Sequence, residues 1–267
     1  MRVQANYYQQ FDADLKRDIP GEAYAGWQKA EIELAPEHTA VVVMHAWDTG
    51  TPEQYPGWYR CVDYLPRAQN ICREVFPPLL GALRAAQWNI FHVVGGGSYY
   101  KSLPGFQRAL KLAGPEPAPY EQAAPDPVLT RLRSFRESNS FVGANNLKDV
   151  QRGFEKLDFP EEARPAGNEG VAENAHQLFA LCKESKVNHL IYMGFAINWC
   201  LLLSPGGMSD MQRRGVMCSA FRQAVTAVEN KETARGELGK ENGLWRVGLQ
   251  FGFVFDVPDF LGALPKR

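Results

Sequence analysis

The stretch from Leu190 to Leu203 constrains the fold of this chain more than any other. It begins with a short apolar run, Leu190-Ile-Tyr-Met193, that stops at Gly194, and Cys200 follows six residues after the glycine. A short apolar run that ends at a glycine is typical of a buried parallel strand. Asn198 is a suitable N-cap residue, so we expect a helix whose second position is Cys200.

A cysteine in the first turn of a helix has a chemical consequence. The N-terminus of a helix carries partial positive charge and unpaired backbone N–H groups. Both features lower the pKa of a thiol and stabilise a developing oxyanion. Cys200 is therefore a candidate nucleophile. The alternative is a buried structural cysteine, because free cysteines are among the residue types most often found in protein cores.

Similar apolar runs elsewhere predict further strands of one sheet. They occur at 39–44, 89–94, 216–221 and 252–256, and segments with helical spacing, such as 172–185, lie between them. Strands that alternate with helices in this way predict an α/β fold. We therefore expect a doubly wound, mostly parallel sheet with helices on both faces, in three α/β/α layers.

The remaining segments divide the chain into an arm and a domain. Residues 1–37 are polar and aromatic and predict an extended N-terminal arm, whereas residues 38–267 predict the α/β domain. Residues 68–87 have helical spacing that Pro77-Pro78 interrupts, which predicts a kink or a break in that helix. We expect a further helix at 223–231.

The net charge excludes two classes of partner. A net charge of −1 over 267 residues gives no electrostatic basis for binding nucleic acid or an anionic membrane surface. No apolar run is long enough to span a bilayer, and the N-terminus lacks the apolar core of a secretory signal. We therefore expect a cytoplasmic protein.

Cysteine and histidine spacing gives no sign of a metal or a cofactor. The five cysteines include no CxxC pair, and the five histidines form no HExxH motif. Gly95-Gly-Gly97 lacks the spacing of a phosphate-binding loop. We therefore interpret it as a turn, or as a pocket wall whose backbone lies close to a ligand. The pattern predicts no disulfide framework, no local metal site and no cofactor.

Polar residues follow several of the predicted strands. His45 and Asp48 follow the strand at 39–44, and Cys200 follows the strand at 190–193. In doubly wound sheets, ligands bind in the crevice outside the carboxyl ends of the strands. We therefore expect these side chains to lie at one site.

The residues Gly194-Phe-Ala-Ile-Asn-Trp-Cys200-Leu resemble the nucleophile motif of the isochorismatase-like cysteine hydrolases. This family includes nicotinamidases and N-carbamoyl amidases. A helix ending at Arg214-Gly215 and a strand leading toward Glu229 fit the same pattern, and 139–143 resembles the aromatic segment that precedes the cysteine half. The resemblance covers roughly residues 38–260 and is that of a divergent member. It implies cleavage of a small amide or related C–N bond through a thioester, and assembly as a homodimer or homotetramer.

The resemblance also implies roles for residues near Cys200. The family uses an Asp, a Lys and a Cys, and two backbone amides form its oxyanion hole. Transferred to this chain, Cys200 is the nucleophile, and the amides of Ile197 and Cys200 form the oxyanion hole. A cis peptide bond is then expected between Ala196 and Ile197.

The sequence departs from the family at the position of the Asp. His45 stands there, and the nearest carboxylate is Asp48, three residues onward. A Cys–His pair is a working arrangement for a nucleophile, so His45 is a candidate base for Cys200, with Asp48 orienting it. The alternative is that His45 is a strand-end residue held in place by a hydrogen bond.

A second departure concerns the lysine. The family's Lys position falls near Phe135–Arg136. Arg136 supplies positive charge there, but it cannot shuttle a proton because the guanidinium stays ionised. The alternative role for Arg136 is a surface or structural ion pair.

Three functions remain open at this stage. The first is a cysteine hydrolase with Cys200, His45, Asp48 and Arg136 at its site. The second is a binding or scaffold protein that keeps the fold without the chemistry, as the missing Asp and Lys indicate. The third is an enzyme with a metal held by His45 and Asp48, with His92 as a further ligand. The aromatic loop at 55–64 indicates an aromatic or apolar substrate, or else wall packing or a subunit contact.

Overall fold

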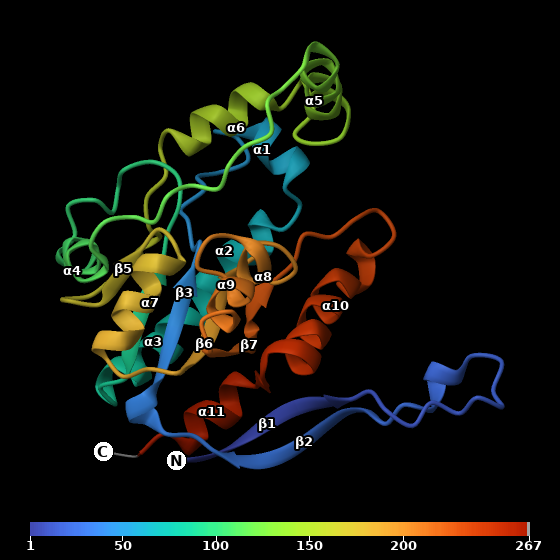
Figure 1. The fold of residues 1–267 in the computed structure, drawn as a ribbon, viewed down its shortest axis with the longest axis vertical. Helices are drawn as coiled ribbons and strands as arrows, with labels where there is room; N and C mark the ends of the chain where they lie inside the picture. The colour runs from blue at the N-terminus through green and yellow to red at the C-terminus, as the bar shows by residue number, and fades with distance from the viewer. Residues whose placement is uncertain (266–267) are drawn as a thin grey trace.

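One sheet of eight strands runs through the molecule, in the order β2-β1-β8-β7-β6-β3-β4-β5 (Figure 1). The computed structural model describes residues 1–265; the last two residues of the expected domain lie outside this range. All neighbouring pairs from β8 to β5 are parallel, and β1 is antiparallel to both β2 and β8. This confirms the mostly parallel sheet. The strands are β1 Arg2–Gln9, β2 Gly26–Glu33, β3 Thr39–Met44, β4 Asn89–Val93, β5 Gly170–Ala172, β6 His189–Phe195, β7 Met217–Thr226 and β8 Val254–Phe255.

Helices cover both faces of the sheet, which confirms the three-layer α/β/α architecture (Figure 1). None of the helices in the described part of the chain combines the length and the apolar character needed to cross a membrane. The helices are α1 Pro56–Cys61, α2 Leu65–Glu74, α3 Phe76–Ala85, α4 Pro104–Ala113, α5 Pro127–Asn139, α6 Leu147–Phe154, α7 Ala175–Glu184, α8 Cys200–Leu203, α9 Met208–Gln212, α10 Leu238–Arg246 and α11 Val257–Ala263, with short turns η1 Pro20–Ala23, η2 Pro36–His38, η3 Glu161–Ala163, η4 Ala234–Gly236 and η5 Val247–Phe251.

The central strand β3 divides the core into two layers. All six of its residues are buried, and alternate side chains point to opposite faces of the sheet. Val41 and Val43 pack with α2, α3 and α11. Val42 and Met44 pack with α7, α9 and α10 on the other face. A strand enclosed in this way must be apolar throughout, which explains why its sequence shows no polar alternation.

The strand order reverses between β3 and β6. From β3 the chain proceeds to β4 and β5 on one side, whereas β6 leads to β7 and β8 on the other. Such a reversal opens a crevice at the carboxyl edge of the sheet, where ligands bind in doubly wound folds. The register pairs Met44 with Gly194 at this point.

Gly194 permits the close approach of these two strands. Its φ is 122°, and a Cβ built on it would lie 1.9 Å from the carbonyl oxygen of Met44. Any other residue would push β6 away from β3 at the edge where the crevice begins.

Two sequence predictions need correction. The N-terminal arm was expected as a part separate from the α/β domain, but β1 and β2 form a hairpin, and Asn6 of β1 pairs with Val254, so the arm extends the main sheet. The helix expected at 223–231 is wrong, because β7 continues to Thr226, where it pairs with the end of β6 after a break in register. The extra strand pairing overrides the local preference for helix.

The kink expected within 68–87 is present as a complete break. The segment forms two helices that meet at Val75. Pro77 and Pro78 lie in the first turn of α3, where a proline removes no hydrogen bond that the helix needs.

A buried ion cluster joins α3 and β4 to the loop before β5. The Glu169 carboxylate accepts hydrogen bonds from His92 Nε2 at 2.8 Å, from Arg84 Nε at 2.7 Å and from Arg84 Nη2 at 3.0 Å. Burial raises the pKa of Glu169, but the hydrogen bonds from His92 and Arg84 outweigh it and bring that pKa down to about 2. Burial keeps the pKa of His92 below its ordinary value, so the imidazole is neutral and serves as a donor.

We predict that Glu169→Gln destabilises the fold by about 1–3 kcal/mol at neutral pH, because buried donors lose a charged acceptor. The native carboxylate has a lower pKa than it has in the unfolded chain. The ionised Glu169 carboxylate therefore makes its full contribution to the free energy of unfolding above the pKa that it has in the unfolded chain. This contribution is lost as the pH falls from that value toward about 2. Urea unfolding at several pH values measures both effects. The free energy of unfolding of the variant should decrease less steeply at acidic pH than that of the parent chain. Exposed Glu161→Gln is the control, and equal effects of the two substitutions would contradict the prediction.

Candidate active site

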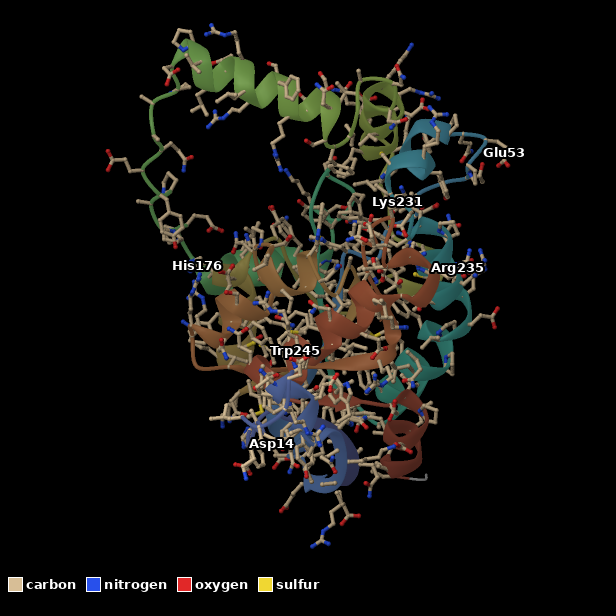
Figure 2. All side chains as sticks on the ribbon, turned by 90° about the vertical axis from the view of Figure 1, so that its right-hand side faces the viewer. Asp14, Glu53, His176, Lys231, Arg235 and Trp245 are labelled. Atoms are coloured by element: carbon tan, nitrogen blue, oxygen red, sulfur yellow. The ribbon has the colours of Figure 1, made fainter. Side chains whose placement is uncertain are left out.

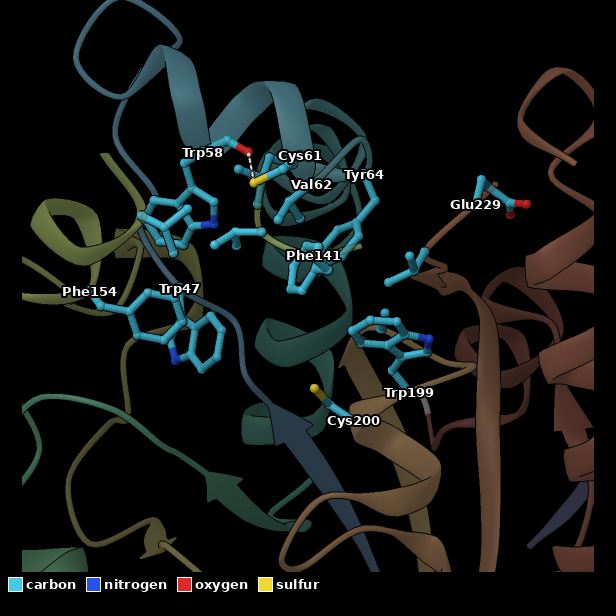
Figure 3. A pocket seen from close by; sticks show the side chains of 15 residues that line it. Trp47, Trp58, Cys61, Val62, Tyr64, Phe141, Phe154, Trp199, Cys200 and Glu229 are labelled. Carbon is cyan, nitrogen blue, oxygen red and sulfur yellow. Dashed lines mark hydrogen bonds between the residues drawn. The ribbon is translucent and has the colours of Figure 1, made fainter. Parts of the chain in front are cut away.

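A pocket of about 410 Å³ lies at the carboxyl edge of the sheet, beside the ends of β3 and β6 (Figure 3). Its walls are mostly apolar and aromatic, and they come from four separate segments of the chain. The lining residues are Trp47, Trp58, Cys61, Val62, Tyr64, Leu65, Phe141, Val142, Val150, Phe154, Ala196, Trp199, Cys200, Val228 and Glu229.

Cys200 is the first residue of α8 and is partly exposed to this pocket. Figure 3 shows its side chain projecting into the space that has Trp47 and Phe154 on one side and Trp199 on the other. The alternative of a fully buried structural cysteine is therefore wrong for Cys200, although it holds for Cys72, Cys182 and Cys218.

Asn198 has a different task from the one predicted. Trp199 occupies the position before the helix, and no side chain caps α8. The Asn198 amide instead donates to the carbonyl of Val228 at 2.8 Å and accepts the N–H of Val228 at 3.0 Å. These two bonds fasten the β6–α8 turn to the segment after β7 and so fix the direction in which Cys200 leaves the sheet.

The oxyanion-hole prediction is wrong for Ile197. Its N–H donates to the carbonyl of Thr226 at 2.8 Å, so it is unavailable to a ligand. The cis peptide bond joins Phe195 to Ala196 and not Ala196 to Ile197. Within residues 1–265, the amides of Ala196 and Cys200 have no hydrogen-bond acceptor. Both of these residues line the pocket.

His45 lies beside the pocket and is not among the residues that line it. Its ring stacks on Trp47, with ring centroids 4.7 Å apart, and Trp47 forms the wall. Burial lowers the pKa of His45 to about 4, so the ring is neutral at pH 7. Nδ1 is buried and has no partner in the part of the chain that the structure describes, and no hydrogen bond there joins His45 to the sulfur of Cys200. The alternative role, a strand-end residue held by a ring hydrogen bond, is therefore not seen either.

Asp48 and Arg136 are not brought to Cys200. Asp48 lines a separate polar pocket, and its carboxylate accepts the N–H of Gly50 at 3.0 Å. Among the described residues it makes no contact with the ring of His45 by hydrogen bond. Arg136 is exposed on α5, a helix without buried residues. These placements leave the catalytic roles of both residues without geometric support.

The metal hypothesis also lacks support. His92 lies on the buried part of β4 and bonds to Glu169. Across residues 1–265, no three His, Cys, Asp or Glu side chains are arranged to hold a metal ion.

The sequence did not single out the part of the wall that comes from α6. Gly57 donates its N–H to the Asp149 carboxylate at 2.7 Å, which ties α6 to α1. Gly153 then packs so closely on the Trp58 ring that a Cβ would lie 2.2 Å from it. Phe154 reaches Trp47 and Trp58, with ring centroids 5.7 and 5.3 Å away. The run of aromatic residues at 55–64 was the only local signal for this wall.

Tyr64 and Glu229 are the titratable side chains of the pocket besides its two cysteines. Burial raises the pKa of Tyr64, and a negative charge on Cys200 would raise it further. The Glu229 carboxylate accepts the N–H groups of Gly239 and Lys240, at 2.8 and 2.9 Å, and so caps α10. It is turned away from Cys200 (Figure 3). Its task in this structure is to hold α10 against the pocket.

Two aromatic residues stand at the pocket mouth. Trp199 and Phe141 are 48% and 45% exposed, and their rings meet edge to face with centroids 5.9 Å apart. Exposed aromatic rings beside an apolar cavity are typical of a ligand entrance.

No protein-family model and no curated protein matches the sequence. Solved structures do match. A cysteine hydrolase from Pseudomonas syringae pv. phaseolicola is 14% identical over 86% of this chain and 93% of its own, with a TM-score of 0.49. An isochorismatase-like hydrolase from Alkaliphilus metalliredigens is 14% identical over 85% and 99%, with a TM-score of 0.48. A nicotinamidase from Staphylococcus aureus is 13% identical over 80% and 97%, with a TM-score of 0.37.

These structures are similar to the present one in fold.

We predict that His45 makes the fold less stable as the pH is lowered. Its pKa is about 4 in the folded chain and about 6.5 in the unfolded chain, so between these values only the unfolded chain gains the proton. The contribution of neutral His45 to the free energy of unfolding is complete above pH 6.5 and falls as the pH drops toward 4. His45→Asn, which suits the positive φ of 49°, should remove about 3 kcal/mol of that dependence between pH 6.5 and 4.

Denaturant unfolding across this pH range measures the difference between the two chains. His189 has a similarly lowered pKa, so the variant should keep part of the slope. Identical slopes for the variant and the parent chain would contradict the assignment. A ¹⁵N NMR titration of the His45 ring provides an independent check.

Proposed function

We propose that this protein is a cysteine-dependent hydrolase of a small amide or related C–N compound. One observation carries the proposal: the sulfur of Cys200 projects into a ligand-sized pocket beside two backbone amides that have no acceptor among residues 1–265. Pockets of about 300–1,000 Å³ are typical of small-molecule sites. A nucleophile and unengaged donors at the same cavity are what acyl transfer requires.

In the proposed reaction, Cys200 Sγ attacks the carbonyl carbon of the substrate. The carbonyl oxygen becomes an oxyanion and accepts the N–H groups of Ala196 and Cys200. The C–N bond breaks, the nitrogen leaves with a proton, and a thioester remains on Cys200. Water then attacks the thioester and releases the acid. Loss of one oxyanion donor is expected to cost about 10²–10³ in rate.

We assign the proton transfer to His45. Its neutral ring and unpartnered Nδ1 leave a nitrogen free to accept a proton. It also follows β3, the strand that pairs with the end of β6. A base with a pKa of about 4 holds a proton only briefly at neutral pH, so we expect slow turnover. Asp48 and Arg136 have no part in this scheme, because Asp48 lines a separate polar pocket and Arg136 is exposed on α5.

We propose that the substrate is uncharged and carries an aromatic or apolar group. Trp47, Trp58, Phe154 and Trp199 supply aromatic faces and edges to the pocket. Glu229 is the only charged residue among those that line it, and its charge is negative. An anionic substrate would lose its hydration there without gaining a cationic partner.

A second function is a binding protein that performs no chemistry. One observation favours it: within the described residues, no imidazole, ammonium or carboxylate group is hydrogen-bonded to the sulfur of Cys200. The two candidates agree on the ligand and differ on whether a thioester forms.

We predict that Cys200→Ala lowers the hydrolysis of neutral aromatic amides by at least about 10³-fold, because the nucleophile is removed. Cys61→Ala is the matched control, since Cys61 lines the same pocket and burial raises the pKa of its thiol. The control should lose less than about tenfold. Intact-protein mass spectrometry of a quenched reaction should show one acyl group on the parent chain and none on Cys200→Ala.

Two outcomes would decide against the enzyme. Equal activity of the Cys200→Ala variant and the parent chain would remove Cys200 from the mechanism. Tight binding of the amides with no product and no acyl group would favour the binding protein.

We also predict that the pocket prefers neutral ligands. Benzamide should bind at least about tenfold more tightly than 4-carboxybenzamide, since the added carboxylate has no partner in the pocket. Quenching of tryptophan fluorescence measures both affinities. Phe154→Ala should weaken the binding of benzamide, whereas exposed Leu249→Ala, at a residue that does not line the pocket, should not. Tighter binding of the anion would contradict the proposed ligand class.

A further inference from the structure

The helix α5 stands away from the body of the protein (Figures 1 and 2). None of its residues is buried. Val128, Leu132 and Phe135 are 54%, 61% and 68% exposed, at the i, i+4 and i+7 positions of one helix face. An amphipathic helix normally turns such a face toward a core, and residues 1–265 bury none of this face.

A second exposed apolar segment lies at the tip of the hairpin formed by β1 and β2. In this arm tip, residues 10–25, Phe11, Leu15 and Ile19 are 57%, 84% and 57% exposed. The hairpin joins the main sheet through β1, but residues 10–25 lie beyond its last paired residues, Gln9 and Gly26. Apolar side chains gathered at its end are therefore unfavourable in a monomer and indicate a contact surface.

The two surfaces carry opposite charge. The helix α5 has three arginines, Arg131, Arg133 and Arg136, against the single acid Glu137. The arm tip has the opposite excess, with four acids and two bases: Asp12, Asp14, Asp18, Glu22, Lys16 and Arg17. Each surface therefore combines exposed apolar side chains with a charge that complements the other surface.

These surfaces do not meet within one chain. The arm tip extends from the β1–β2 edge, and α5 lies at the opposite end of the molecule; in Figure 2, the region of Asp14 is at the bottom and α5 is at the top. A second copy of the chain removes this restriction. In a two-fold symmetric pair, any contact between one copy's arm tip and the other copy's α5 occurs twice.

We propose that the protein self-associates through contact between the arm tip of one copy and α5 of another. The apolar side chains of the two surfaces bury one another, and the opposite charges set the pairing. The inference does not depend on catalysis by Cys200. It has a consequence for the pocket, however, because α5 leads directly into Phe141 and Val142, which line the pocket. Docking on α5 then steadies that part of the wall.

Charge reversal tests the pairing directly. One variant carries Arg131→Glu and Arg133→Glu on α5, and the other carries Asp18→Lys and Glu22→Lys on the arm tip. All four side chains are exposed and form no ion pair within residues 1–265, so neither variant should disturb the fold. Circular dichroism and thermal unfolding verify this before association is measured.

Sedimentation equilibrium over a range of protein concentrations is the measurement. The parent chain should associate, and each variant alone should associate at least about tenfold more weakly, because like charges then face each other. An equal mixture of the two variants should regain association, since every contact in the mixed pair is again between opposite charges. High salt should weaken the association of the parent chain.

Leu132→Ser tests the apolar part of the contact, with exposed Leu249→Ser as the matched control. The first should weaken association at least about tenfold, and the second should leave it unchanged. A parent chain that stays monomeric at all concentrations would overturn the proposal. The proposal would also be overturned if both charge-reversed variants associated as strongly as the parent chain. It would be overturned as well if each variant were weakened but the equal mixture failed to associate.

Discussion

The contact between Gly194 and Met44 is the constraint on which the rest of the structure depends. It allows β6 to lie against β3 up to the very end of both strands, with no room for a side chain at position 194. The strand order reverses between these strands, so a crevice opens at their carboxyl ends. The β6–α8 turn begins after Phe195, the residue that follows Gly194, and presents Cys200 at the base of that crevice.

The pocket that results is poor in charge, because nearby charged groups already have structural partners. Glu229 holds the first turn of α10, and Asp149 holds α1 to α6. Asp63 pairs with Arg67 and accepts the N–H of Glu229. The unengaged polar groups near Cys200 are backbone amides, which supply fixed dipoles without a buried charge. A site of this kind suits a neutral ligand. Negative charge that develops on the ligand would be stabilised by main-chain N–H groups.

The sequence predicted the strands best where burial is complete. Runs such as 39–44 and 190–193 are apolar on both faces, and only a central parallel strand makes that composition favourable. It failed at 223–226, where pairing with the end of β6 decides the structure. The prediction that the Ile197 amide is available to a ligand was also wrong. The sequence does not show that the Ile197 N–H is taken by Thr226, 29 residues farther along the chain. The family resemblance placed Arg136 at the site, yet Arg136 lies on α5, none of whose residues is buried.

The sequence by itself determined the α/β architecture, the strand that ends at Gly194 and the position of Cys200 at the start of a helix. These features follow from local periodicity, chain stiffness and the conformational freedom of glycine. Only the tertiary structure decided which groups surround the sulfur: aromatic walls from α1, α2 and α6, a histidine stacked behind Trp47, and the free amides of Ala196 and Cys200. The physical reason is that these neighbours come from segments far apart in the chain. Packing and hydrogen bonding, which no local pattern encodes, bring them together.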